Sequence, residues 1–416
     1  MQPLRIAFFG NYWDSQIYKG RLYLWSLDND LSVLDWESLV ESIETEENRM
    51  PLRCAFTRGD YLYRFTEDRL LFDDPPFKEF LYSRFSALAN ASFLIEAKHV
   101  SAATLRTQSN PISSLHDDAQ IYWDTLYALT DTGLYSIGVN KPRKNKSLVT
   151  RKAEHLWDGL GLSLQIGSST AAIAAADDGL FEFKLRSEGE PKQLSKRHTS
   201  FANWNFASIY ASSTIEHGYL AAFKWELGNE PKRTPNSFAA AEEVFEPSFT
   251  RTFEGLIEEV SIFGRDAESA HHLTIGCAEK IYRIKKQSIE VVNFVQKNLE
   301  EDDQSKAFGQ LGDVRAESLK ELGEPLSAAV AFFGLIIEYQ NGLVVLTSDN
   351  DVTKIMGPIS RWRVFPRSRR YENHLHVVFD DRIEIYSFNN DYFIDQASKK
   401  LGQKYQADRF KRWSRK

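Results

Sequence analysis

The chain has 416 residues, of which 42% are hydrophobic and 13% aromatic, so it is long enough to bury a large core. Its only two cysteines, Cys54 and Cys277, exclude a disulfide framework of more than one bond and favour a reducing compartment. The formal net charge of -7 is unevenly spread: residues 361–416 carry 14 Lys and Arg against 7 Asp and Glu, which gives this end +7 and the rest of the chain -14.

No stretch of the sequence predicts insertion into a membrane or transport across one. The beginning, MQPLRIAFFGNYW, lacks the long apolar segment and the small residues of a secretory leader. The longest apolar run, residues 328–337, is about half as long as a bilayer-spanning helix. We therefore expect a soluble cytoplasmic protein.

A β-hairpin pattern recurs along the chain. Its clearest copy is AAIAAADDGLFEFKL, residues 171–185, in which an apolar run is followed by an Asp-Asp-Gly turn and an alternating run. In chain order, such patterns are centred on Gly20, Gly59, Gly133, Gly179, Gly218 and Gly342. Weaker copies without the glycine are centred on Glu279 and Arg382, and a poor copy lies near Glu96.

The spacing of these turns is typical of a propeller. Six of the eight intervals lie between 37 and 46 residues, and the other two are 61 and 63. One four-stranded blade takes roughly 40 to 50 residues, with the hairpin as its middle strands and an inner strand about ten residues earlier. Residues 161–166 and 202–205 fit such inner strands. In these features the chain resembles the WD-repeat-like β-propeller superfold, although the Gly-His and Trp-Asp signatures of WD repeats do not recur.

This resemblance implies an all-β fold, a closed β-propeller over residues 1–395. Nine turns overcount the blades, so we favour seven blades, with eight as the alternative. The last strands should pair with the N-terminal strand, residues 4–9, in a shared blade. Short helical insertions are expected in loops near 36–50, 227–259 and 297–325, the first because its apolar residues have helical spacing. Residues 396–416 form a basic C-terminal tail.

Known catalytic and cofactor motifs are absent from the sequence, so we assign no catalytic residue, cofactor or metal ligand. His374 and His376 would share one face of a strand near Asp380, which is the most metal-like pattern, but no third ligand is specified. The carboxylate pairs at 177–178 and 380–381 lie at turns, where Asp is expected for backbone reasons.

Arginines and aromatic residues alternate in SRWRVFPRSRR, residues 360–370, which is typical of protein interfaces and of single-stranded nucleic-acid platforms. The candidate binding residues here are Arg361, Trp362, Arg363, Phe365, Arg367, Arg369 and Arg370. In the structural alternative, the aromatic rings wedge between blades and the arginines pair with the acidic body. Trp157 and Trp204 are further candidates, because with Trp13 and Trp362 they would form an aromatic patch if they cluster; otherwise they belong to the core.

Two functions are compatible with these patterns. The first is a non-enzymatic scaffold or adaptor subunit of an intracellular complex that binds one or more proteins, which is a common use of the fold. The second is a propeller that binds nucleic-acid phosphates through residues 361–370 and 396–416, with an affinity that falls steeply with salt. A propeller hydrolase or lyase is a third alternative, because such enzymes assemble their sites from scattered residues.

Overall fold

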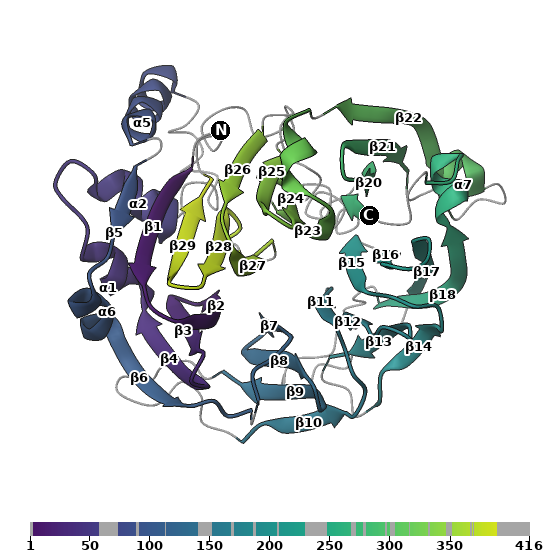
Figure 1. Cartoon of the computed structure of the whole chain (residues 1–416), viewed down its shortest axis with the longest axis horizontal. Coiled ribbons are helices and arrows are strands. Elements are labelled where there is room, and N and C mark those ends of the chain that lie inside the picture. The colour runs from purple at the N-terminus through teal and green to yellow at the C-terminus, as the bar shows by residue number, and fades with distance from the viewer. Residues whose placement is uncertain are drawn as a thin grey trace, which may run out of the picture.

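Seven separate sheets are arranged in a ring in the computed structural model of the protein (Figure 1). The prediction of an all-β propeller with seven blades is therefore confirmed. The structure describes residues 3–57, 74–88, 91–112, 114–139, 152–167, 170–185, 189–205, 208–228, 248–267, 272–277, 280–295, 298–299, 304–315, 317–331, 333–346, 352–366, 368 and 370–388.

We number the blades 1 to 7 along the chain and give the strands of each from the inside outward. Blade 1 contains β2 (Tyr12–Tyr18), β3 (Arg21–Ser26), β4 (Asp30–Asp35) and β6 (Thr104–Ser109). Blade 2 contains β7 (Asp118–Tyr122), β8 (Thr125–Thr130), β9 (Gly133–Gly138) and β10 (Glu154–Trp157). Blade 3 contains β11 (Ser163–Ile166), β12 (Thr170–Ala174), β13 (Leu180–Lys184) and β14 (Lys192–Ser195). Blade 4 contains β15 (Phe201–Asn205), β16 (Ser208–Ser212), β17 (Tyr219–Gly228) and β18 (Ser248–Glu258). Blade 5 contains β19 (Leu273–Cys277), β20 (Lys280–Ile284), β21 (Ser288–Phe294) and β22 (Phe308–Arg315). Blade 6 contains β23 (Pro325–Ala331), β24 (Gly334–Tyr339), β25 (Gly342–Leu346) and β26 (Val352–Met356). Blade 7 contains β27 (Ile359–Val364), β28 (His374–Phe379), β29 (Arg382–Ser387), β1 (Leu4–Phe9) and β5 (Ser92–Leu94).

The hairpin predicted at residues 171–185 is formed by β12 and β13. Every residue of β12 is buried, which explains its small and apolar composition, because both faces of a blade are covered by its neighbours. Its turn needs glycine: Gly179 has φ +89°, and a Cβ there would lie 2.1 Å from the carbonyl oxygen of Ser195 in the next strand.

The other predicted hairpins fall into three groups. Those at Gly133, Gly218, Gly342 and Arg382 join the two middle strands of a blade, as expected. Two others, at Gly20 and near residue 279, join the first and second strands instead, because any tight antiparallel turn leaves the same pattern in the sequence. The poor copy near Glu96 is not a hairpin, since Glu96 follows the edge strand β5 and precedes a helix. The copy at Gly59 lies outside the described residues.

The predicted inner strands are confirmed for blades 3 and 4, where β11 and β15 lie innermost. Each inner strand contacts the inner strand of the next blade, in the order β2, β7, β11, β15, β19, β23, β27 and back to β2.

Blade 7 joins the two ends of the chain, as the sequence predicted. Strand β1 pairs antiparallel with β29, with Leu4 opposite Ser387 and Phe9 opposite Arg382. Strand β5 then adds to the outer edge of β1 in parallel. The ring therefore closes through a sheet to which both ends of the described chain contribute.

Helices lie outside blades 1 and 7 (Figure 1). They are α1 (Trp36–Glu41), α2 (Arg49–Phe56), α5 (Pro75–Ala87) and α6 (Ala97–Ala103). The predicted helical spacing near residue 36 is realised in α1, which buries Trp36, Leu39 and Val40. This helix begins at an N-cap, where the Asp35 side chain accepts a hydrogen bond from the Ser38 amide (3.0 Å). The insertion extends further than expected, to residue 103.

The two later insertions also differ from expectation. Between 227 and 259, β17 and β18 occupy the flanks, α7 (Glu259–Phe263) follows β18, and residues 229–247 lie outside the described part. Between 297 and 325, the chain forms β22, the outer strand of blade 5, flanked by two 3-10 helices, Gln304–Ala307 and Glu317–Leu322. Residues 396–416 lie outside the description as well. None of the described helices has the length and apolar character needed to cross a bilayer.

Strand β1 offers a test of ring closure. The ring of Phe8 is fully buried in the core of blades 7 and 1, whereas the adjacent Phe9 is 62% exposed. We expect Phe8→Ala to lower the free energy of unfolding by about 3–5 kcal/mol, because it leaves a cavity in the closing blade. Phe9→Ala is the matched control and should change it by less than about 0.5 kcal/mol in urea unfolding. Equal effects of the two changes would contradict this role of β1.

Candidate functional site

One cavity of about 550 Å³ lies at the centre of the ring. The inner strands of all seven blades contribute to its wall, with at least one residue each: Gln16, Gln120, Gln165, Asn203, Gly276, Ala328 and Trp362. Because strands build this wall, its shape depends on how the blades pack.

Glutamines join successive inner strands. In blades 1 to 3, a glutamine side chain bonds to the backbone of the next inner strand. The three bonds are Gln16 Nε2 to Ala119 O (2.8 Å), Ile166 N to Gln120 Oε1 (2.8 Å), and Trp204 N to Gln165 Oε1. The inner strands of blades 1 to 4 therefore run side by side in the same direction.

A short sequence pattern accompanies these glutamines. The residue two positions earlier is Asp14, Asp118 or Ser163, and residues two apart share one face of a strand. Like the glutamines, these side chains bond to the next blade: Asp14 Oδ2 to His116 Nε2 (2.6 Å), Leu164 N to Asp118 Oδ2 (2.7 Å), and Ala202 N to Ser163 Oγ (3.4 Å). This Asp/Ser-x-Gln pattern is the signal in the sequence from which these bonds between blades could have been predicted.

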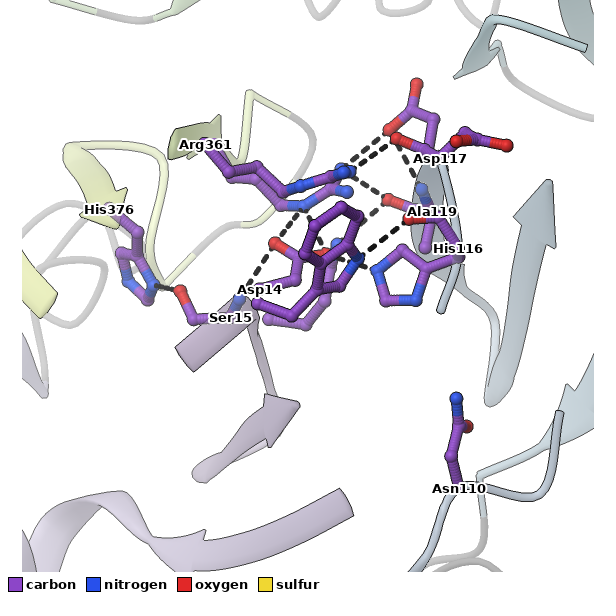
Figure 2. A network of polar contacts seen from close by, with 12 residues as sticks. Asp14, Ser15, Asn110, His116, Asp117, Ala119, Arg361 and His376 are labelled. Carbon is purple, nitrogen blue, oxygen red and sulfur yellow. Dashed lines mark hydrogen bonds and ion pairs between the residues drawn. The ribbon is translucent and has the colours of Figure 1, made fainter. Parts of the chain in front are cut away.

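A network of polar contacts that includes Asp14, His116 and Ala119 lies beside this cavity (Figure 2). Arg363 of β27, which lines the cavity, donates most of its hydrogen bonds within this network. Its Nε donates to both carboxylate oxygens of Asp14 (2.6 and 2.8 Å). Its Nη1 donates to Asp118 Oδ1 (2.8 Å) and to the Ala119 carbonyl (2.6 Å). One guanidinium therefore joins blade 7 to blades 1 and 2.

Asp14 is fully buried and is satisfied by several donors at once. Besides Arg363, its carboxylate accepts hydrogen bonds from His116 Nε2 (2.6 Å) and from the Ser15 amide (2.7 Å). Burial alone would raise the pKa of Asp14, but the charge of Arg363 and the bond from His116 outweigh it and hold that pKa well below its ordinary range. The carboxylate is therefore ionised inside the protein.

Arg361 lies on the same side of the ring. Its guanidinium stacks 4.4 Å from the ring centre of Trp13, and its Nη1 donates to the Asp117 carbonyl. Trp13 in turn donates from Nε1 to the His116 carbonyl (2.8 Å). Arg361 and Arg363 thus both have internal partners, as the structural alternative for this segment predicted.

Five of the predicted binding residues line the cavity: Trp204, Arg361, Trp362, Arg363 and Phe365. Trp362 donates from Nε1 to Glu338 Oε2 (2.8 Å). The ring of Phe365 packs edge-on against His376, with centroids 4.7 Å apart. Trp204 is nearly buried, and its ring packs beside Phe223.

The remaining candidates lie elsewhere. Trp157 ends β10, the outer strand of blade 2, where its ring packs 4.9 Å from that of Phe181 in blade 3. Because it fills the space between two sheets, it does not join the other tryptophans around the cavity. Arg370 is half-buried in the connection between β27 and β28, and Arg367 and Arg369 lie outside the described residues.

The histidine pair of β28 is fully buried. His376 Nδ1 bonds to Ser15 Oγ (2.8 Å), and His374 Nε2 lies 3.1 Å from the Ala55 carbonyl. Burial lowers the pKa of His374 to about 4, so its imidazole is neutral at pH 7. Asp380 instead accepts a hydrogen bond from Ser360 Oγ (2.8 Å). These contacts tie β28 to its neighbours.

The fold assigns the chain to the seven-bladed β-propellers. No family model matches its sequence, and no curated protein matches it either. Similar solved structures include BamB from Moraxella catarrhalis, at 10% identity over 89% of this chain and 82% of that chain, with a TM-score of 0.37. Others are the N-terminal domain of Nup159 (9% identity, 91% and 90% coverage, TM-score 0.44) and the computationally designed Ika8 protein (8%, 93% and 100%, 0.44). At these identities the likeness concerns the fold alone.

Removal of Arg363 tests the network. We expect Arg363→Ala to lower the free energy of unfolding by about 3–5 kcal/mol, because Asp14 would become a buried, poorly compensated charge. Arg106→Ala removes an exposed arginine of β6 and should change it by less than about 0.5 kcal/mol. Urea unfolding of both variants measures this difference, and similar values for the two would refute the assignment.

The pH dependence of stability tests Asp14. Because folding lowers its pKa, the carboxylate stabilises the protein above its ordinary pKa of about 3.9 and loses this effect as the pH falls below it. We expect Asp14→Asn to be destabilised at pH 7, with the difference from the wild type narrowing below about pH 4. Urea unfolding at several pH values checks this, with the exposed Asp28→Asn as a control. A difference that stays constant down to pH 2 would be inconsistent with an ionised Asp14.

Proposed function

We propose that the protein is a non-enzymatic interaction module that holds a partner protein against one face of its ring. The observation that carries this proposal is the rim of the central cavity, where the exposed side chains of Leu162 and Leu326 lie at or next to a wall that contains tryptophan and arginine. We call the face on which the inner strands begin the entry face.

Topology places several connections on the entry face. In an antiparallel blade the second strand returns to the level at which the first began. The turns between second and third strands, and the connections into each inner strand, therefore belong to this face. Exposed large aliphatic residues on this face include Leu27, Leu160, Leu162, Ile215 and Val260 in such connections, and Leu326 near the start of β23. Of these, Leu162 lines the cavity, and Leu326 adjoins the lining residue Ser327.

This arrangement suits a protein partner. When a partner covers exposed apolar side chains on a rigid framework, the free energy of the complex is lowered. Tryptophan and arginine are among the residues that most often dominate such interfaces. Trp362 is held in place by Glu338, whose carboxylate also accepts a hydrogen bond from Ser327 Oγ (2.5 Å). In the wall, Arg363 pairs with Asp118, and Arg361 donates to the Asp117 carbonyl, which supports a structural rather than a catalytic role.

The proposal includes a role as an adaptor subunit of a cytoplasmic complex, which the low cysteine content favours. The nucleic-acid alternative requires arginines that bind phosphates. Arg361 and Arg363 instead have hydrogen-bond partners inside the protein. The other basic residues invoked for it include Arg367, Arg369 and the tail 396–416, which lie outside the described part. The experiment below separates the two functions.

The rim can be tested by charge insertion. We expect the double change Leu162→Glu and Leu326→Glu to reduce capture of the partner at least about tenfold, because an interface that covers these residues cannot accommodate carboxylates. Affinity capture of the tagged protein from a nuclease-treated lysate, quantified by mass spectrometry, identifies proteins lost with this change. Binding of the purified partner is then measured directly.

Leu105→Glu is the matched control, because Leu105 is 50% exposed, against 43% for Leu162 and 51% for Leu326, but lies on the outer strand β6. It should leave capture unchanged. Proteins retained equally by all variants would count against the rim. Bound nucleic acid that is released by salt or nuclease would favour the second function instead.

A further inference from the structure

A second polar cluster lies on the entry face, between blades 4 and 5. His217 belongs to the turn between β16 and β17, Glu259 begins α7 directly after β18, and His272 immediately precedes β19. One ligand atom from each residue lies within 4.8 Å of the other two. Within the described part of the chain, this is the only group of three His, Cys, Asp or Glu side chains gathered so closely.

The carboxylate of Glu259 is held in place from several sides. It is 2% exposed, and its Oε2 accepts hydrogen bonds from His272 Nε2 (2.7 Å) and from the Gly218 amide (2.8 Å). Its Oε1 accepts from Arg283 Nη1 (3.3 Å), a side chain with no exposed surface. Burial would raise the pKa of Glu259, but the bond from His272 and the nearby charges lower it, so the group is a carboxylate at neutral pH.

His217 provides access from solvent. Its side chain is exposed, and its ring centre lies 6.3 Å from that of His272, which is 4% exposed. The backbone of this turn is anchored by Arg197, whose Nη2 donates to the His217 carbonyl (3.0 Å) and whose Nη1 pairs with Glu258 (2.7 Å). The histidine is therefore presented by a fixed turn while its imidazole can rotate.

We propose that His217, Glu259 and His272 bind a zinc ion that bridges blades 4 and 5. Two imidazoles and one carboxylate are an established zinc ligand set, which leaves a fourth position for water or another ligand. Arg283 and Gly218 are not ligands in this site. They donate hydrogen bonds to the Glu259 carboxylate and so fix its orientation, as hydrogen-bond partners of metal ligands commonly do.

Zinc binding requires small rearrangements of the three side chains. Ligand distances of about 2.0–2.2 Å allow ligand atoms of one zinc to be at most about 4 Å apart, so the imidazole of His217 must turn slightly inward. The contact between His272 and Glu259 must also open a little. His272 Nε2 then binds the ion in its unprotonated form, and the imidazole proton that it donated to Glu259 is carried by Nδ1 instead.

The fourth position gives the site a chemical role. Because His217 is exposed, this position faces the surface on which the rim of the cavity lies, and a histidine or carboxylate of another molecule can occupy it. The ion also links two blades that are otherwise joined by side-chain packing and hydrogen bonds, so its binding stabilises the folded state.

Metal titration of the full-length protein tests the site. After chelator treatment and removal of the chelator, we expect isothermal titration to show that one zinc ion binds per chain. His217→Ala should weaken zinc binding by more than about 100-fold, because loss of a direct ligand costs more than the 10–100-fold typical of an outer partner. His217 is exposed, so this change should leave folding intact by circular dichroism.

Two further variants make the test specific. His155→Ala removes a partly exposed histidine of β10, outside the site, and should leave zinc affinity unchanged. His217→Cys should retain binding and give the cobalt-loaded protein a thiolate charge-transfer absorption band, because cysteine is itself a ligand of these metals. Absence of zinc binding by the wild type, or equal binding by wild type and His217→Ala, would overturn the proposal.

Discussion

The ion pair between Arg363 and Asp14 joins the last blade of the ring to the first. Removing two charges from water costs several kcal/mol for each, and this cost is offset only when hydrogen bonds satisfy both groups. Asp118 and Ala119 of blade 2, and His116 in the connection that leads into it, complete those bonds, so blades 7, 1 and 2 must all be in place. The network can therefore be satisfied only in a closed ring.

A similar arrangement occurs across the ring, between blades 4 and 5. There the buried Arg283 pairs with Glu259 at 3.3 Å and with Glu290 at 2.5 Å. Burial would raise the pKa of Glu290, but bonds from Lys285, Arg283 and Arg265 lower it to about 2. In both places an arginine pairs with two carboxylates, one of which also bonds to a histidine, at a junction of blades. They differ in access, because the second cluster ends in the exposed His217.

The rim and the wall of the cavity differ in how much they contribute to the stability of the ring. Strands and paired charges build the wall, so its geometry is tied to the stability of the ring. Side chains at the rim such as those of Leu162 and Leu326 are exposed and take no part in the network around Asp14. If the rim binds a partner as proposed, its residues can therefore change without disturbing that network.

Local patterns in the sequence were sufficient to predict the propeller, seven blades, the hairpin of β12 and β13, and the pairing of the chain ends, because period-two hydrophobicity and turn chemistry act over a few residues. Local patterns did not predict which strands each turn joins, nor the edge strand β5 and the outer strand β22. These features depend on pairing with other segments of the chain. The same is true of the sites. Arg363 and Asp14 are 349 residues apart, and His217 and Glu259 become neighbours only when β17 pairs with β18. The sequence by itself determined the architecture, whereas the tertiary structure alone decided which charges meet, since burial and pairing are properties of the assembled ring.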